Sequence, residues 1–237
     1  LNHLKNKEVR IQMKGFRPNP EIIGQIYEIG LPAIVMQAIG SAMNYGMNRI
    51  LITFSSTATA VFGVYFKLQS FVFMPVFGLN NGVTPIIAYN YGAQNRERVV
   101  SAIRHVVTYA VIVMLLGLAA FQLLPRQLLL MFDASETMLA LGIPALRIIS
   151  LSFVLASFGV AASGAFQALG KSIYSMYVSV ARQLVVLLPA AFLLAQTGRV
   201  ELVWWAFPIA ELVSFAMSVI FMVHINRKII SKIGKKS

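Results

Sequence analysis

Residues 106–124, VVTYAVIVMLLGLAAFQLL, form an uninterrupted run without a charged side chain. A transmembrane α-helix needs about 20 consecutive, mostly apolar residues to cross the hydrocarbon core of a bilayer. Five further stretches of the sequence have similar length and character. The six predicted membrane helices are residues 30–51, 59–88, 106–124, 139–169, 172–195 and 202–223. The sequence therefore predicts an all-α fold, a polytopic membrane protein built as a bundle of six transmembrane helices.

The overall composition supports this interpretation. Hydrophobic residues make up 58% of the 237 residues, charged residues make up 12%, and the mean hydropathy is +0.74. A soluble domain of this composition would lack the polar side chains to cover its surface, whereas lipid as the solvent removes that need. The net charge of +12 does not form a stripe on a polar domain. We therefore expect the lipid bilayer as a partner, and no nucleic acid.

Residue types that carry covalent or metal chemistry are sparse. The sequence has no cysteine, and its three histidines (His3, His105 and His224) are not at metal-ligand spacing. An intramembrane enzyme would need a Ser–His pair, paired aspartates or a metal cluster within the membrane, and none is evident. We therefore expect no enzyme activity, no cofactor and no metal site.

Lysine and arginine are distributed unevenly between the two sides of the predicted bundle. Three of them, Arg49, Arg126 and Arg199, flank one set of turns. Fourteen lie on the opposite side: Lys5, Lys7, Arg10, Lys14, Arg17, Arg96, Arg98, Arg104, Lys171, Arg227, Lys228, Lys232, Lys235 and Lys236. Because cytoplasmic loops carry the excess of basic residues, both termini are predicted to be cytoplasmic in the plasma membrane of a prokaryote. Residues 1–18 then form a basic arm, 19–226 the membrane lobe and 227–237 a basic tail.

Two segments outside the six spans have helical character. Residues 123–137 (LLPRQLLLMFDASET) are expected to form an outer loop with a short interfacial helix, and Asp133 or Ser135 is expected to cap the helix that follows. Residues 20–29 alternate apolar and polar side chains at helical spacing. They predict an amphipathic helix that lies along the inner membrane surface and leads into the first span.

Polar side chains recur at helical spacing inside three of the spans. Gln37, Ser41, Asn44 and Asn48 share one face of the first span. The second span carries Gln69, Asn80, Asn81 and Thr84, and the fourth carries Ser152, Ser163 and Gln167. Such stripes favour a water-filled cavity that binds substrate. Hydrogen bonding between helices is the alternative, because it is common in membrane bundles.

The second span also contains residues that bend helices or let them approach closely. Pro75 and Pro85 each remove a backbone hydrogen bond, while Gly78 and Gly82 have the spacing of a close helix contact. Bent helices beside a cavity suit a protein that alternates between two states. A static kink is the other interpretation.

Four charged side chains fall inside the predicted spans: Lys67, Arg147, Arg182 and Glu211. We expect Glu211 to neutralise one of the cations, with Arg182 favoured because consecutive helices usually pack together. The remaining cations are then expected to snorkel towards the interface. The alternative is that Glu211 takes part in proton or cation coupling.

Residues 74–93 (MPVFGLNNGVTPIIAYNYGA) resemble the bacterial branch of the multidrug and toxic compound extrusion (MATE) family. Weaker resemblance lies in Gly30–Pro32, in residues 163–171 (SGAFQALGK) and in residues 207–211 (FPIAE). The resemblance implies a transporter of twelve helices in two six-helix lobes around a central cavity. It implies export of cationic, amphipathic drugs in exchange for Na⁺ or H⁺.

This chain is similar to the second lobe of such a transporter, and its start at Leu1 rather than Met also favours a fragment. The missing N-terminal six-helix lobe is then a partner. Some family members place carboxylates on the helices equivalent to residues 30–51 and 139–169, and this sequence has none in the cores of these spans. A lipid-linked oligosaccharide flippase of similar architecture is the alternative function, because Lys67, Arg147 and Arg182 could converge on a pyrophosphate headgroup.

The charge bias generates a test of orientation. Single cysteines at Ser56 and Ser135 should react with a membrane-impermeant thiol reagent in intact cells, because the turns that contain them are predicted to lie outside. A cysteine at Gln94 should react only after the membrane is opened. The cysteine-free sequence is its own unlabelled control, and the reverse labelling pattern would invert the predicted orientation.

Overall fold

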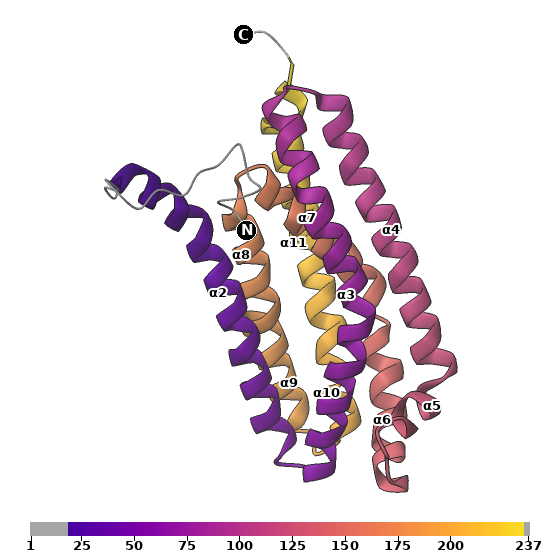
Figure 1. The fold of residues 1–237 in the computed structure, drawn as a ribbon. Coiled ribbons are helices and arrows are strands. Elements are labelled where there is room, and N and C mark those ends of the chain that lie inside the picture. The colour runs from indigo at the N-terminus through magenta and orange to yellow at the C-terminus, as the bar shows by residue number, and fades with distance from the viewer. Residues whose placement is uncertain (1–18, 235–237) are drawn as a thin grey trace, which may run out of the picture.

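The computed structural model describes residues 19–234, and within that range the chain forms helices joined by short turns and no strands (Figure 1). The basic arm and the last three residues of the tail lie outside the described residues. The helices are α2 (Pro20–Leu51), α3 (Ser56–Gly92), α4 (Arg96–Leu123), α5 (Pro125–Leu130), α6 (Glu136–Ser150), α7 (Phe153–Ala168), α8 (Ser172–Val180), the π-helix η1 (Ala181–Leu187), α9 (Leu188–Ala195), α10 (Val200–Val203), α11 (Ala206–Lys228) and the 3₁₀-helix η2 (Ile230–Lys232).

The chain passes back and forth along the bundle six times. The turns after α2, α4 and α9 gather at one end, and the turns after α3 and α7 gather at the other together with the end of α11 (Figure 1). Successive turns thus alternate between the two ends of the bundle, as six predicted spans require. Which end faces the cytoplasm stays a prediction.

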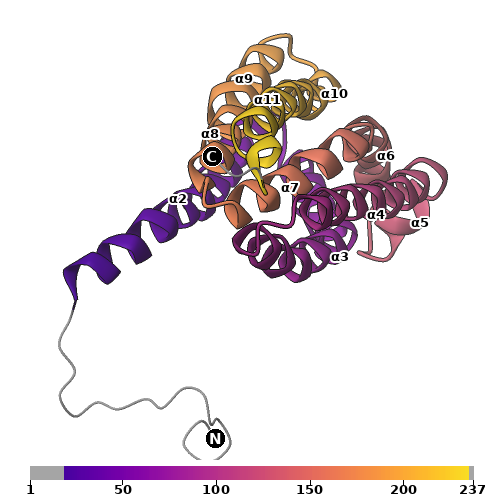
Figure 2. The same ribbon diagram turned by 90° about the horizontal axis from the view of Figure 1, so that it is seen from above.

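The helices are arranged in two groups with α7 between them (Figure 2). On one side of α7, α3 packs against α4 and α6. On the other side, α11 packs against η1 and α9, and α2 runs along α8 and α9. The N-terminal half of α2 diverges from the bundle (Figure 2), and its apolar side chains Ile22, Ile26 and Ile34 are 55%, 63% and 62% exposed.

Two hydrophobic clusters hold the bundle together. The larger one occupies the half near the α2–α3 turn and includes the fully buried Tyr65, Phe153 and Trp204. The smaller one lies at the opposite end, where Phe166 and Ile225 pack with neighbours from α3, α4 and η2. Many large apolar side chains outside these clusters are exposed, among them Phe71, Leu116 and Ile220, as expected where lipid replaces water as the solvent.

Four helical spans in the described chain are long and apolar enough to cross a membrane by length and composition. They are Ser56–Gly92, Arg96–Leu123, Ser172–Ala195 and Val200–Lys232. The pair α6 and α7 would make a fifth, although the two helices are bent by 51° relative to each other. The sixth predicted span, within α2, is not among them, and the polar stripe along this helix lowers its hydropathy. The protein is thus an all-α membrane protein with a less apolar first span.

The structure corrects several predicted boundaries. Residues 20–29 do not form a separate surface helix, because α2 continues through Pro32, whose fixed φ angle is compatible with a helix. The third helix begins at Arg96, ten residues earlier than predicted, with Asn95 as its cap. The expected interfacial helix is present as α5, and Ser135 caps α6 by accepting a hydrogen bond from the Met138 amide at 3.3 Å.

Close helix contacts occur at other glycines than the predicted pair. A Cβ atom built at Gly78 or Gly82 would have no neighbour within 4 Å, so neither makes a close contact in the described chain. At Gly164 on α7, by contrast, a Cβ atom would overlap the side-chain amide of Asn80 on α3. The α3–α7 contact therefore depends on a glycine outside the GxxxG spacing. Pro75 and Pro85 lie within α3, which continues through both as one helix.

Substituting two glycines tests this assignment. Gly164→Ala should lower the free energy of unfolding by about 1–3 kcal/mol, because the added methyl group displaces Asn80 from a packed contact. Gly78→Ala is the matched control and should be neutral or slightly stabilising, since alanine favours the helix and meets open space. Thermal unfolding of the purified chain in detergent would measure both. Equal effects of the two substitutions would contradict the proposed contact.

Candidate functional site

Two of the four charges in the predicted spans, both partly buried, form one short ion pair. The Arg182 guanidinium Nη1 donates to Glu211 Oε1 at 2.7 Å, with the two side chains 30% and 12% exposed. This joins η1 to α11 and confirms Arg182 as the partner of Glu211. Two other ion pairs in the described chain, Arg126–Glu136 and Arg199–Glu201, are longer and well exposed at the opposite end from α11's C-terminus.

An aromatic cluster joins α3 to α11, the helix that carries Glu211. Tyr65 is 1% exposed, and its ring meets Phe207 edge-on at a centroid distance of 5.6 Å. Phe62 packs against both of these rings. In such apolar surroundings an unpaired charge would be costly, which explains why the two charges meet.

Arg182 lies in a π-helical turn, a local feature that the sequence reasoning missed. The π-helix η1 ends where α9 begins, and Pro189 in the first turn of α9 has no backbone N–H to continue the ordinary helical ladder. Short π-helical segments are frequent at functional sites. The neighbouring Gln183 is 8% exposed, donates to Ser179 Oγ at 2.8 Å and lies against Gly40 of α2. The turn thus places two polar side chains between helices.

The predicted stripe on α2 faces away from the bundle. Gln37, Ser41 and Asn48 are exposed, and Asn44 is half-buried. The amides of Asn44 and Asn48 donate to backbone carbonyls one turn earlier, at 3.2 and 2.9 Å. These side chains are therefore satisfied within their own helix, and they leave a polar face that neighbouring helices of this chain do not cover.

The stripe on α3 divides between two environments. The Asn80 side chain packs on Gly164 of α7, whereas the Thr84 hydroxyl donates to the Asn80 carbonyl at 2.8 Å within α3 itself. Gln69 is half-buried, whereas Asn81 is exposed, as is Gln167 on α7. Helical spacing had aligned Gln69, Asn80 and Thr84 on one face of the second span and had placed Gln167 in the stripe of the fourth.

The remaining intramembrane cations lie apart from the ion pair. The Lys67 ammonium is 5.8 Å from the centroid of the Phe132 ring in the loop after α5, so the side chain extends towards that end of the bundle. The Arg147 side chain is exposed on α6. Because Arg182 is bound to Glu211 and Lys67 contacts Phe132, the arrangement does not match the shared cationic site that a pyrophosphate headgroup would need.

The predicted span 139–169 is broken after Ser150, and the break is hydrogen-bonded from another helix. The amide of Gln122 on α4 donates to the Arg147 carbonyl at 2.8 Å and to Ser150 Oγ at 3.0 Å. Ser152 Oγ donates to the Ile149 carbonyl at 2.6 Å. Two features of the sequence could have indicated this break: a glutamine within the third predicted span, and serines on both sides of residue 151.

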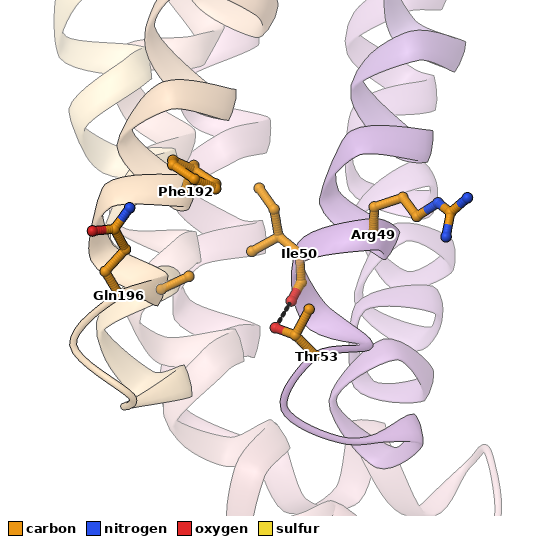
Figure 3. Close-up of a pocket in the computed structure, with 6 residues that line it drawn as sticks. Arg49, Ile50, Thr53, Phe192 and Gln196 are labelled. Atoms are coloured by element: carbon orange, nitrogen blue, oxygen red, sulfur yellow. Dashed lines mark hydrogen bonds between the residues drawn. The ribbon is translucent and has the colours of Figure 1, made fainter.

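A hollow of about 390 Å³ opens between the ends of α2 and α9 (Figure 3). It is lined by Arg49, Ile50, Thr53, Phe192, Ala195 and Gln196. The Arg49 guanidinium points away from the hollow (Figure 3), and its Nε donates to Tyr45 Oη at 3.0 Å. The Thr53 hydroxyl donates to the Ile50 carbonyl at 2.7 Å. The walls are thus mainly apolar, and none of the predicted stripe residues lines it.

These features define an all-α integral membrane protein with a charged pair between two helices and polar faces left open. Residues 32–193 match the family model MatE, and the chain therefore belongs to the MatE family. The resemblance inferred from residues 74–93 is confirmed.

Known relatives agree with this assignment. The chain is 26% identical over 230 residues to the multidrug export protein MepA of Staphylococcus haemolyticus, covering 96% of this chain and 50% of MepA. A crystal structure of a MATE protein in complex with MaL6 superposes with a TM-score of 0.85 at 25% identity, covering 99% of this chain and 53% of that one. A MOP superfamily transporter from Pyrococcus furiosus, described as having a binding pocket of reverse polarity that suggests a different function, gives the same values. The chain spans about half the length of the relatives it matches.

The ion pair yields a testable expectation. Glu211→Gln should lower the free energy of unfolding by about 3–5 kcal/mol, because the Arg182 cation loses its partner in an apolar site. Replacing Glu211 and Arg182 together with glutamine should recover much of this loss. Glu201→Gln, which removes an exposed pair, is the matched control and should change stability by less than about 1 kcal/mol.

Thermal unfolding of the purified variants would measure these differences. If Glu211→Gln leaves stability unchanged but abolishes transport, or shifts the pH dependence of any transport that remains, in the chain co-expressed with its first lobe, Glu211 is instead a coupling residue.

Proposed function

We propose that this chain forms the second six-helix lobe of a transporter that exports cationic, amphipathic drugs across the cytoplasmic membrane of a prokaryote. The observation that carries the proposal is the match of nearly the whole chain to half of MepA, a multidrug export protein. The superposition on half of a MATE structure supports the same division. Both termini are proposed to be cytoplasmic, as the basic residues predict.

The open faces of the chain support a role in binding drugs between two lobes. The amide stripe on α2 and exposed Asn81 on α3 offer hydrogen bonds, while Phe71, Met74 and Phe77 on α3 offer exposed apolar and aromatic surface. Aromatic and methionine side chains adapt to varied apolar cations. The missing N-terminal lobe would close this surface into a cavity.

Coupling to Na⁺ or H⁺ is proposed to depend on carboxylates outside this chain. Glu211 is the one acidic residue in the predicted spans, and it is engaged by Arg182. A carboxylate held by a guanidinium at 2.7 Å is a poor site for a further cation. The coupling acid would therefore belong to the other lobe.

Export of an anionic lipid-linked oligosaccharide is less favoured. The Pyrococcus furiosus neighbour illustrates that this fold can host a pocket of reversed polarity. Here, however, Arg182 is neutralised by Glu211, and Lys67 is turned towards Phe132. The arrangement leaves Arg147 without a second cation to share a pyrophosphate group.

The proposal predicts that residues 1–237 expressed alone do not export drugs. Cells expressing this chain should accumulate a fluorescent cation such as ethidium to the same level as cells with an empty vector. Co-expression with a matching first lobe should lower accumulation, and the first lobe alone is the control. Efficient export by the chain alone would overturn the two-lobe proposal or show that two copies of the chain act together.

A further inference from the structure

A second, smaller hollow lies at the end of the bundle where α11 terminates. Its volume is about 180 Å³, and it is lined by Tyr91, Gln94, Lys228, Ile229, Lys232 and Ile233. Pockets for drug-sized molecules usually have volumes of about 300–1,000 Å³. This hollow is therefore suited to a small group rather than to a whole drug.

Hydrogen bonds join the two turns that enclose the hollow. Gln94 adopts a left-handed conformation with φ of 56° in the turn between α3 and α4. Its Oε1 accepts from the Gly234 amide at 3.2 Å, and its Nε2 donates to the Tyr91 carbonyl at 3.2 Å. Gly234 has φ of 73°, and a Cβ atom there would lie 3.2 Å from the Gln94 carbonyl oxygen. The chain beyond α11 is thereby attached to the α3–α4 turn.

Apolar packing orients the two lysines that border the hollow. Ile230 and Ile233 are 2% and 5% exposed and belong to the smaller hydrophobic cluster. With these side chains anchored in the bundle, Lys228 and Lys232 remain exposed on either side of the half-exposed Ile229. Both lysines border the same hollow, so both ammonium groups can approach one bound group.

The positive charges around the hollow favour an anionic ligand. Within residues 19–234 no carboxylate lies within 4 Å of the Lys228 or Lys232 ammonium. The turns at this end of the bundle carry several more cations and one acid, Glu97: the cations are Arg96, Arg98, Arg104, Lys171 and Arg227. A hollow bordered by two lysines in such surroundings attracts negative charge.

We propose that this hollow binds the phosphate headgroup of an anionic phospholipid in the cytoplasmic leaflet. A lipid fits the position, because the hollow lies at the end of a membrane-spanning helix and the cytoplasmic leaflet supplies anionic headgroups. Exposed Ile220 and Val223 on α11 lie one to two turns deeper and offer an apolar surface for the acyl chains. Tyr91 at the rim is a side chain typical of the membrane interface. The site is independent of which substrate the transporter carries.

Native mass spectrometry of the detergent-solubilised chain, titrated with phosphatidylglycerol, would test the site. Replacing Lys228 and Lys232 together with glutamine should weaken binding about thirtyfold, from the contribution expected for two lysines at a membrane surface. The matched control is Arg96→Gln with Arg98→Gln, which removes the same charge from the same end outside the hollow, and it should weaken binding less than about threefold. Phosphatidylcholine with the same acyl chains should bind the unaltered chain only weakly. Its affinity should not exceed the affinity of phosphatidylglycerol for the variant that lacks both lysines.

Three outcomes would overturn the proposal. If both double substitutions weaken lipid binding equally, the effect is due to general surface charge and not to the hollow. If phosphatidylcholine binds as tightly as phosphatidylglycerol, the acyl chains alone account for binding. Displacement of the lipid by inorganic phosphate at matched concentration would identify a soluble anion as the ligand. Replacing both lysines with arginine keeps the charge and should retain binding, which separates loss of the ligand from loss of the fold.

Discussion

Backbone hydrogen bonding without water is the constraint on which this structure depends. In the hydrocarbon region each N–H and C=O group must find a partner inside the protein, so a break in a helix needs compensation from nearby. The break after Ser150 illustrates this, because Gln122 reaches across from α4 to the Arg147 carbonyl while Ser152 bonds the Ile149 carbonyl. A bend of 51° is tolerated there because its polar groups are satisfied. The irregular turn at η1 is likewise enclosed by packing from α11 and α2.

The same lack of water governs where charges lie. Glu211 and Arg182 come from different helices and meet at 2.7 Å, so neither is left alone in an apolar site. Lys67 uses its long side chain to reach an aromatic ring in a loop. Most of the remaining basic residues lie in or near the turns at the bundle's ends, where headgroups and water are available. The positions of the charges and the arrangement of the helices thus both follow from the apolar interior of the membrane.

Some of this architecture was predictable from the sequence because apolar length is a direct signal of a membrane helix. The span 172–195 was predicted with the bounds that α8, η1 and α9 together have. The π-helical turn inside it was not, since it changes hydrogen bonding without changing composition. The continuous helix predicted for residues 139–169 was wrong for a similar reason: the bend depends on Gln122, a residue that precedes this span. Local patterns do not identify such long-range partners.

The candidate site was predictable to a smaller extent. The predicted spans contain three cations that could pair with Glu211, and the packing of consecutive helices favoured Arg182, as the structure has it. Helical spacing also grouped the polar residues of each helix, but it could not tell an exposed amide from a packed one. Asn80 and Asn81 are adjacent in sequence, yet one packs on Gly164 and the other is exposed. Which face of α3 is covered depends on α7, and the glycine that allows the close approach lies 84 residues away from Asn80.

The distribution of exposed groups bears on how the proposed transporter would recognise a cation. The open faces of α2 and α3 carry amides, aromatic rings and methionine, which can contact a drug without holding its charge. The one carboxylate in the predicted spans is already bound to a guanidinium, and its release would leave Arg182 unpaired. A cation that replaced Arg182 would have to offset that penalty as well as its own desolvation. It is therefore less costly for this lobe to supply shape and polar contacts while negative charge is supplied from outside it.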